Sequence, residues 1–273
     1  MASRSKSPTC SIAIVGGGVQ GISLLHILNK CGHQVKLFEK SHQVGGVWSN
    51  HGRVPYMRLQ LNSKIYRFPN HPHPENIDMP YANYIQHYLQ TMVNEKGLSK
   101  YIVYNVEIDR AQQISAEEYV LFDKQNRKIN GVFQYVIYTG TASVPRIPPL
   151  FKNVNNVLHS SVLSQINIDK LKNKRCIVYG GSKSAAEMAL VASRSGASSV
   201  IWIARRFCNF VKFKPGTTVD MVDVFKSALN MNMKTVYQYK ILPDDESHFG
   251  SGNLLTIQQY DELMKVDRIR DEI

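Results

Sequence analysis

The chain has 273 residues, of which 43% are hydrophobic and 20% charged, an ordinary globular composition with room for one large domain or two medium ones. Its formal net charge is +12, yet it carries no long basic block and no nucleic-acid-binding signature, so we expect no nucleic-acid partner. No apolar run reaches the ~18 residues that a membrane-spanning helix needs, and the N-terminus has no apolar signal core, so we expect a cytoplasmic protein without a transmembrane segment. Four scattered cysteines without a CxxC pair predict free thiols, not disulfides or a metal site.

Apolar runs alternate with helical stretches in the first half of the chain, a pattern typical of α/β proteins. The first elements expected are a strand at Ile12–Val15, a helix at Val19–Cys31 and a strand at Val35–Glu39, which together form a βαβ unit. Five prolines make the stretch from His42 to Pro80 loop-rich. The next elements expected are a helix at Asn83–Val93 and a small antiparallel element that returns to the main sheet, with strands at Ile102–Ile108, Glu118–Phe122 and Phe133–Tyr138.

A second βαβ unit follows, with a strand at Cys176–Tyr179, a helix at Ser184–Arg194 and a strand at Val200–Ala204. The simplest interpretation is a second Rossmann-like domain inserted into the first. We therefore predict an α/β protein with two dinucleotide-binding domains, which cover residues 1–145 and 146–273.

A glycine triplet lies between the first strand and the first helix. Gly16, Gly18 and Gly21 form G-x-G-x-x-G, in which the glycines allow a tight turn, a close approach to a pyrophosphate and close helix packing. Glu39 ends the second strand, where a carboxylate accepts a bond from a ribose hydroxyl. Its charge would repel a 2′-phosphate, so this site suits FAD or NAD better than NADP.

Two stretches beyond Glu39 carry a family resemblance. They are VGGVW, with Gly45, Gly46, Val47 and Trp48, and RLQLNSKIYRFPNHPHP, from Arg58 to Pro74. Both resemble the flavin-containing monooxygenase family, and most closely its plant branch. The resemblance implies FAD at the first site, with Gly46, Val47 and Trp48 near the flavin.

The animal branch of this family holds an asparagine amide beside the flavin, where it contacts the reduced flavin and its oxygen adduct. An ungapped count back from Phe68 puts Gln60 at this position, and a shifted register puts Asn62 there. An amide donor can hold the terminal oxygens of a flavin hydroperoxide and slow the loss of peroxide. Gln60 and Asn62 are therefore the candidate catalytic residues.

The second glycine turn resembles the family's NADP motif, G-x-G-x-S-A or its GKSA variant. Gly180 takes the first position, Ser182 replaces the second glycine, and Ser184 matches the serine. Arg205 and Arg206 follow the next strand, where arginines suit the 2′-phosphate of NADPH.

The link between the domains also resembles the family. Thr139 and Gly140 match its A-T-G segment and are assigned to cofactor binding. His159 matches part of a family fingerprint and is expected to anchor a loop rather than act as a base.

The resemblance implies an NADPH-dependent flavin monooxygenase that takes O₂ and a small-molecule substrate. A flavin C4a-hydroperoxide would pass its distal oxygen to a soft nitrogen or sulfur nucleophile, with the chemistry carried by the cofactor. Family members continue well past residue 273, so we expect the NADP-binding domain to be incomplete at its C-terminal end. Three alternatives stay open: a Baeyer–Villiger-type relative, an NADPH oxidase or diaphorase-like flavoprotein, and a non-catalytic nucleotide-binding remnant.

Overall fold

The chain divides into two compact units in a computed structural model. The first unit is Met1–Arg53 with Ala82–Pro145, and the second is Val54–Tyr81 with Arg146–Ile273. The structure describes residues 9–50, 52–140, 145–165, 168–204, 211–213, 254–256, 261–263 and 265–270. The domain bounds expected from the sequence, 1–145 and 146–273, stay a prediction.

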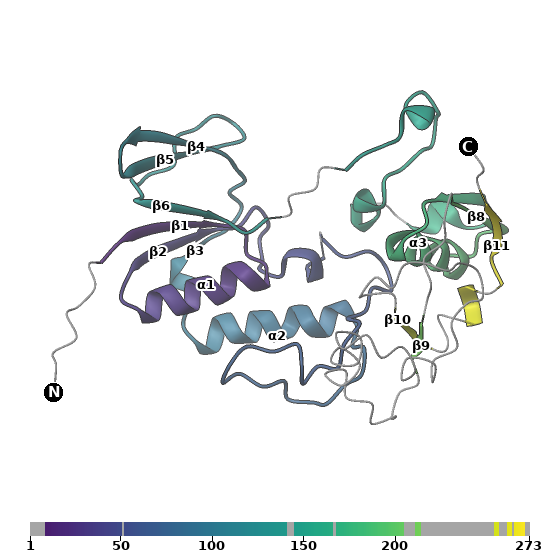
Figure 1. Cartoon of the computed structure of the whole chain (residues 1–273), viewed down its shortest axis with the longest axis horizontal. Coiled ribbons are helices and arrows are strands. Elements are labelled where there is room, and N and C mark those ends of the chain that lie inside the picture. The colour runs from purple at the N-terminus through teal and green to yellow at the C-terminus, as the bar shows by residue number, and fades with distance from the viewer. Residues whose placement is uncertain are drawn as a thin grey trace, which may run out of the picture. The chain divides into compact units, whose positions relative to one another are not determined.

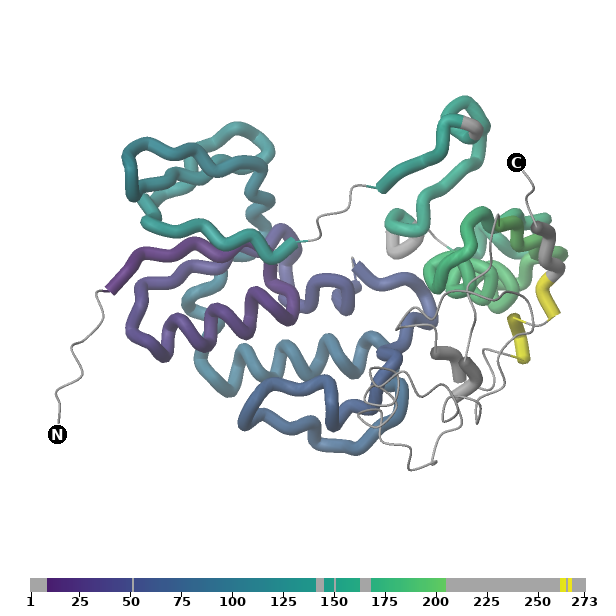
Figure 2. Tube along the Cα trace, viewed as in Figure 1, coloured from purple at the N-terminus to yellow at the C-terminus, as the bar shows by residue number. Residues whose placement is uncertain are grey.

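A four-stranded parallel sheet forms the centre of the first unit (Figure 1). Its strand order is β3-β2-β1-β6, with bounds Ile102–Val103, Gln34–Phe38, Ser11–Val15 and Tyr135–Tyr138. The helices α1 (Val19–Lys30) and α2 (Ala82–Glu95) lie on one side of this sheet, and the hairpin of β4 (Ile108–Ser115) and β5 (Glu118–Asp123) lies on the other. The predicted βαβ unit is therefore present as β1, α1 and β2, which Figure 2 shows as one continuous trace.

Burial explains why these residues form a parallel sheet. The three central residues of β1, Ile12, Ala13 and Ile14, are all buried, as expected for a strand that is covered on both faces. On one face, Ala13 and Phe38 pack with Leu121 and Phe133. The hairpin is therefore part of the first unit's core.

One predicted strand, Ile102–Ile108, was wrong as a single element. Only Ile102–Val103 joins the parallel sheet, and a new strand begins at Ile108. Between them Asn105 has a φ of 58°, a left-handed conformation that ends an extended strand. The remainder of β4 is exposed, so it lacks the apolar alternation that would have predicted it.

Residues 54–81 form a long irregular segment, as their prolines predict (Figure 2). Its backbone is joined across isolated bridges, Arg58 to Tyr81 and Asn62 to Asp78. Inside these bridges Ser63 is fully buried, and its Oγ donates to the Glu75 carbonyl oxygen over 2.8 Å. The segment is therefore irregular, but hydrogen bonds between its two halves hold it together.

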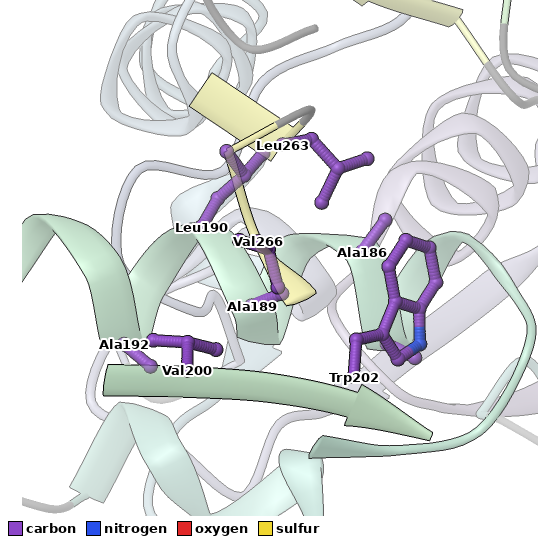
Figure 3. Close-up of a cluster of buried hydrophobic side chains, with 9 residues drawn as sticks. Ala186, Ala189, Leu190, Ala192, Val200, Trp202, Leu263 and Val266 are labelled. Atoms are coloured by element: carbon purple, nitrogen blue, oxygen red, sulfur yellow. The ribbon is translucent and has the colours of Figure 1, made fainter. Parts of the chain in front are cut away.

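The second unit contains the second βαβ element, formed by β7 (Arg175–Tyr179), α3 (Lys183–Arg194) and β8 (Ser199–Ala204). These strands belong to a parallel sheet of order β11-β8-β7, in which β11 is Asp267–Arg270. The side chains of α3 and β8 pack together around Trp202, with Leu263 and Val266 completing the cluster (Figure 3). Three consecutive turns of α3 contribute alanines, which allow the helix to lie close to the sheet.

The remaining elements of the described residues are short. The strands β9 (Val211–Phe213) and β10 (Leu254–Thr256) pair in parallel. The 3₁₀ turns are Gly46–Trp48, Ser99–Tyr101, Pro149–Phe151, Ser160–Gln165 and Ile168–Leu171. Within the described ranges, no helix is both long enough and apolar enough to cross a membrane.

Candidate dinucleotide sites

The first glycine turn connects β1 to α1. Gly16 has a φ of 110°, which an L side chain rarely adopts. Gly18 is the N-cap of α1 and provides no side-chain hydrogen bond to it. The first N–H groups of the helix are therefore left for a bound anion, and the helix dipole favours a negative charge there.

The spacing of the glycines is fixed by packing. A Cβ on Gly21 would collide with the carbonyl oxygen of Gly16, so α1 can approach the turn only with glycine at this position. A Cβ on Gly18 would meet a single neighbour within 4 Å, the Cα of Gly46 at 3.8 Å. Gly21 therefore permits the packing, and Gly18 leaves the open backbone that a pyrophosphate requires.

Glu39 lies buried at the end of β2 and joins two backbone segments. Its Oε2 accepts a bond from the Gly17 N–H over 2.6 Å, and its Oε1 accepts one from the Ser41 N–H over 2.8 Å. A carboxylate has about four acceptor positions, so Glu39 retains capacity for a ribose hydroxyl. The residue thus holds the turn and remains able to bind a ligand.

Tyr104 is a neighbour of Glu39 that the sequence did not indicate. Burial raises the pKa of Tyr104, a hydrogen bond from the Gln90 side chain opposes this, and the Glu39 charge raises the pKa further. The signal that could have found it is an aromatic residue directly after a strand of the parallel sheet.

Thr139 supports the glycine turn from the neighbouring strand. Its Oγ1 lies 3.0 Å from the carbonyl oxygens of both Val15 and Gly16, to which it can donate. Gly140 follows directly, and the nearest atoms that a Cβ there would meet belong to the exposed ring of Tyr138. The structure therefore brings Thr139 and Gly140 to the turn.

The GGVW segment also meets the glycine turn. The Gly45 N–H donates to the Gly17 carbonyl oxygen over 2.9 Å. Gly45 and Gly46 have φ values of 139° and 54°, which explains the glycine pair. Trp48 is buried, whereas Val47 is 47% exposed. The structure thus brings this segment, which sequence reasoning assigned to the flavin, against the first turn.

The two candidate catalytic amides differ in their bonding. Asn62 donates through Nδ2 to Asp78 Oδ1 over 2.6 Å and accepts from the Lys64 N–H over 2.8 Å. The half-buried Gln60 makes no side-chain hydrogen bond to the residues that the structure describes. Asn62 therefore organises its own loop, and Gln60 is the amide left for another partner.

The second glycine turn connects β7 to α3. Gly180 has a φ of 133°, and Ser182 is the N-cap of α3 without a side-chain cap bond. Trp202 Nε1 donates to the Gly180 carbonyl oxygen over 2.5 Å. Ser182 and Ser184 are both exposed beside the turn. The arrangement is again an open helix N-terminus after a left-handed glycine.

Lys183 was missed by sequence reasoning. It lies in the first turn of α3, where the helix dipole disfavours a cation, and its ammonium is 3.3 Å from Glu187. Burial lowers the pKa of Lys183, and the Glu187 carboxylate opposes this shift. A lysine in the first turn of a helix was the available signal.

Two further assignments concern the second unit. Arg205 and Arg206 lie outside the described residues. His159 Nδ1 lies 2.8 Å from Ser161 Oγ and accepts a bond from the Ser161 N–H over 3.1 Å, so the ring is part of a local turn.

The fold and the two turns define an α/β protein with two Rossmann-type dinucleotide sites. The model of the family described as flavin-binding monooxygenase-like matches residues 9–242. The chain belongs to this family, which confirms the resemblance seen in its motifs.

The curated relatives that match this chain are considerably longer than the part that aligns with it. Flavin-containing monooxygenase 3 of Oryctolagus cuniculus is 27% identical over 256 residues, which cover 82% of this chain and 46% of the relative. The trimethylamine monooxygenase of Pelagibacter sp. is 28% identical over 220 residues, covering 69% of this chain and 49% of the relative. The chain thus spans less than half the length of these relatives.

Solved structures support the fold. A mutant flavin monooxygenase from Stenotrophomonas maltophilia superimposes with a TM-score of 0.62 at 18% identity, covering 84% of this chain and 68% of that one. The Tmm structure from Pelagibacter sp. gives a TM-score of 0.56 at 24% identity, covering 71% and 51%. At these identities the likeness concerns the fold alone.

Proposed function

We propose that this chain is the cofactor-binding part of an FAD- and NADPH-dependent monooxygenase that oxygenates a soft nitrogen or sulfur nucleophile. The observation that carries the proposal is the first glycine turn, in which Gly16, Gly18 and Gly21 leave open backbone beside the buried Glu39. This turn fits the pyrophosphate and ribose of a dinucleotide.

FAD fits the first turn better than NADPH does. Glu39 is buried and its oxygens lie within hydrogen-bond distance of two backbone N–H groups, a setting suited to a carboxylate. A 2′-phosphate would meet this charge, whereas the free ribose hydroxyls of FAD would donate to it. The GGVW segment adjoins the same turn, which agrees with a flavin cofactor in this family.

NADPH is assigned to the second turn by the charge at the equivalent place. β8 ends at Ala204, and the next two residues in the sequence are Arg205 and Arg206. Guanidinium groups bind phosphate through paired hydrogen bonds, so arginines after this strand favour the 2′-phosphate.

The substrate class comes from the relatives. One is named a trimethylamine monooxygenase, and the others include flavin-containing monooxygenases. The bound flavin would supply the redox chemistry, accepting hydride from NADPH and reacting with O₂. The chain's own residues would hold the two cofactors, and the Gln60 amide would donate a hydrogen bond near the reacting oxygen.

The test uses purified protein loaded with FAD. NADPH oxidation is measured with trimethylamine or a thioether, and the products are separated into oxygenated substrate and hydrogen peroxide. We expect oxygenated product in proportion to the NADPH consumed, and a Gly18→Val control should show neither activity. Peroxide alone, whatever the substrate, would instead identify an NADPH oxidase, and protein that stays colourless with FAD would identify a nucleotide-binding remnant.

A further inference from the structure

Two side-chain nitrogens of the first unit are buried and have no hydrogen-bond partner among the described residues. They are Nε2 of Gln43 and Nη1 of Arg53, and neither bonds to any residue that the structure describes. Both belong to the first unit, on either side of the GGVW segment. A buried guanidinium donor without an acceptor is costly, and an anion is the partner that removes the cost.

Backbone packing brings Arg53 near the phosphate turn. A Cβ on Gly46 would lie 3.0 Å from the Cα of Gly18, and a Cβ on Gly52 would collide with the Gly46 carbonyl oxygen. Gly18, Gly46 and Gly52 therefore lie backbone against backbone in a stack. Arg53 follows directly, with its N–H donating to the Ser49 carbonyl oxygen over 2.9 Å.

Acidic residues are scarce in the sequence up to and just after Arg53. Residues 1–74 contain nine lysines and arginines and a single acidic residue, Glu39. Both oxygens of Glu39 already accept bonds, from Gly17 and Ser41. Nη1 of Arg53 bonds to none of the residues that the structure describes, Glu39 included, so it is available to an anion, and Gly18 is the glycine at which a pyrophosphate approaches.

We infer that Arg53 binds the pyrophosphate of the dinucleotide at the first turn, an inference that rests on the FAD binding proposed above. The guanidinium supplies a charge-assisted hydrogen bond to a phosphate oxygen and adds to the helix N-terminus of α1. The neutral Gln43 amide is a second, weaker donor. Neither residue belongs to the glycine motif.

The first experiment compares Arg53→Met with Arg53→Lys by titration with FAD and, separately, with ADP. Arg53→Met loses a charge-assisted bond to phosphate, so its affinity for FAD and for ADP should each fall by about ten- to a hundredfold. Arg53→Lys keeps the charge and should lose less. Arg110→Met is the matched control, because Arg110 bonds to Gln112 and Asn126 in the hairpin and lies over Phe122.

The second experiment measures thermal unfolding with and without FAD. An arginine that only supports the fold would make Arg53→Met melt earlier in both states. The inference predicts opposite effects: without FAD the variant melts at or above the wild-type temperature, and with saturating FAD its gain in melting temperature is smaller than the wild type's.

The outcomes separate the two proposals. Wild-type protein that binds neither FAD nor ADP contradicts the proposed function itself. Wild-type binding with an unchanged Arg53→Met affinity leaves that function standing and overturns the inference. Weaker FAD binding with unchanged ADP binding also overturns it, since Arg53 would then contact the flavin half.

Discussion

The two glycine turns have the same layout and begin with the same residue type, but they differ at their second and third motif positions. Gly16, Gly18 and Gly21 in the first turn correspond to Gly180, Ser182 and Ala185 in the second. A Cβ on Gly21 would collide with the Gly16 carbonyl oxygen, whereas Ala185 carries its Cβ 3.5 Å from a Cβ placed on Gly180. The first helix therefore packs more tightly on its turn, and glycine is required there for a reason that the second turn lacks.

The residues after the second strand differ in charge. β2 is followed by Glu39, and β8 is followed by Arg205. Each turn is also held by a side chain from a neighbouring strand, Thr139 in the first and Trp202 in the second. We therefore expect a phosphate site at each turn and expect the residues around it to select the cofactor.

The largest expected effect is at the first turn. Gly18→Val puts a branched side chain where the pyrophosphate approaches, with only Gly46 Cα near its Cβ. We expect the fold to survive and FAD affinity to fall by roughly a hundredfold or more. Flavin absorbance of the purified variant measures this, and stoichiometric FAD would contradict the assignment. Ser182→Val is the matched change in the second turn and should leave FAD content unchanged.

Gln60 tests a region outside both turns. Gln60→Ala should leave FAD content and NADPH reduction intact, because its amide makes no bond to the described residues. Loss of one donor at the reacting oxygen should lower the ratio of oxygenated product to peroxide by roughly a hundredfold.

Asn62→Ala is the comparison for Gln60→Ala. It removes the bonds to Asp78 and the Lys64 N–H, so it should lower the stability of the loop. If Asn62→Ala changes peroxide release and Gln60→Ala does not, the amide that contacts the oxygen adduct is Asn62 and not Gln60.

The arginine pair tests the difference in charge between the turns. Replacing Arg205 and Arg206 with alanine should lower the affinity for NADPH by roughly ten- to a hundredfold. The affinity for NADH should fall much less, because only NADPH has the 2′-phosphate. Binding titrations with both nucleotides measure the ratio. An equal loss of affinity for both nucleotides would contradict the assignment of this arginine pair to the 2′-phosphate.

Thr139 is expected to give the smallest effect. Thr139→Val removes the hydroxyl that lies 3.0 Å from the Val15 and Gly16 carbonyl oxygens and can donate to either. A neutral hydrogen bond contributes about 0.5–1.5 kcal/mol, so FAD affinity should fall by roughly three- to tenfold. Thr139→Ser keeps the hydroxyl and should bind FAD like the wild type.

Much of the fold was predictable because each βαβ unit carries its own signals. Buried parallel strands appear as apolar runs, and glycine marks both turns. The hairpin strand β4 was missed because its exposed residues show no alternation, and the break at Asn105 depends on a backbone conformation that several residue types can adopt.

The candidate sites were predictable only in part. The glycines and Glu39 follow from a motif with a known spacing. Arg53 and Tyr104 depend on contacts between distant segments, such as Gly46 against Gly18, which no local pattern reports. Trp202 looks like an ordinary core residue until its indole N–H is seen to bond to the Gly180 carbonyl oxygen.

We expect one chain to bind two different dinucleotides at its two similar turns. The direct measurement is an FAD titration of the purified chain, followed by flavin absorbance, in the absence and presence of saturating NADP⁺. We expect one FAD per chain with the same affinity in both titrations, because the oxidised nucleotide should occupy the second turn. Competition between the two nucleotides for a single site, or no FAD binding at all, would contradict it.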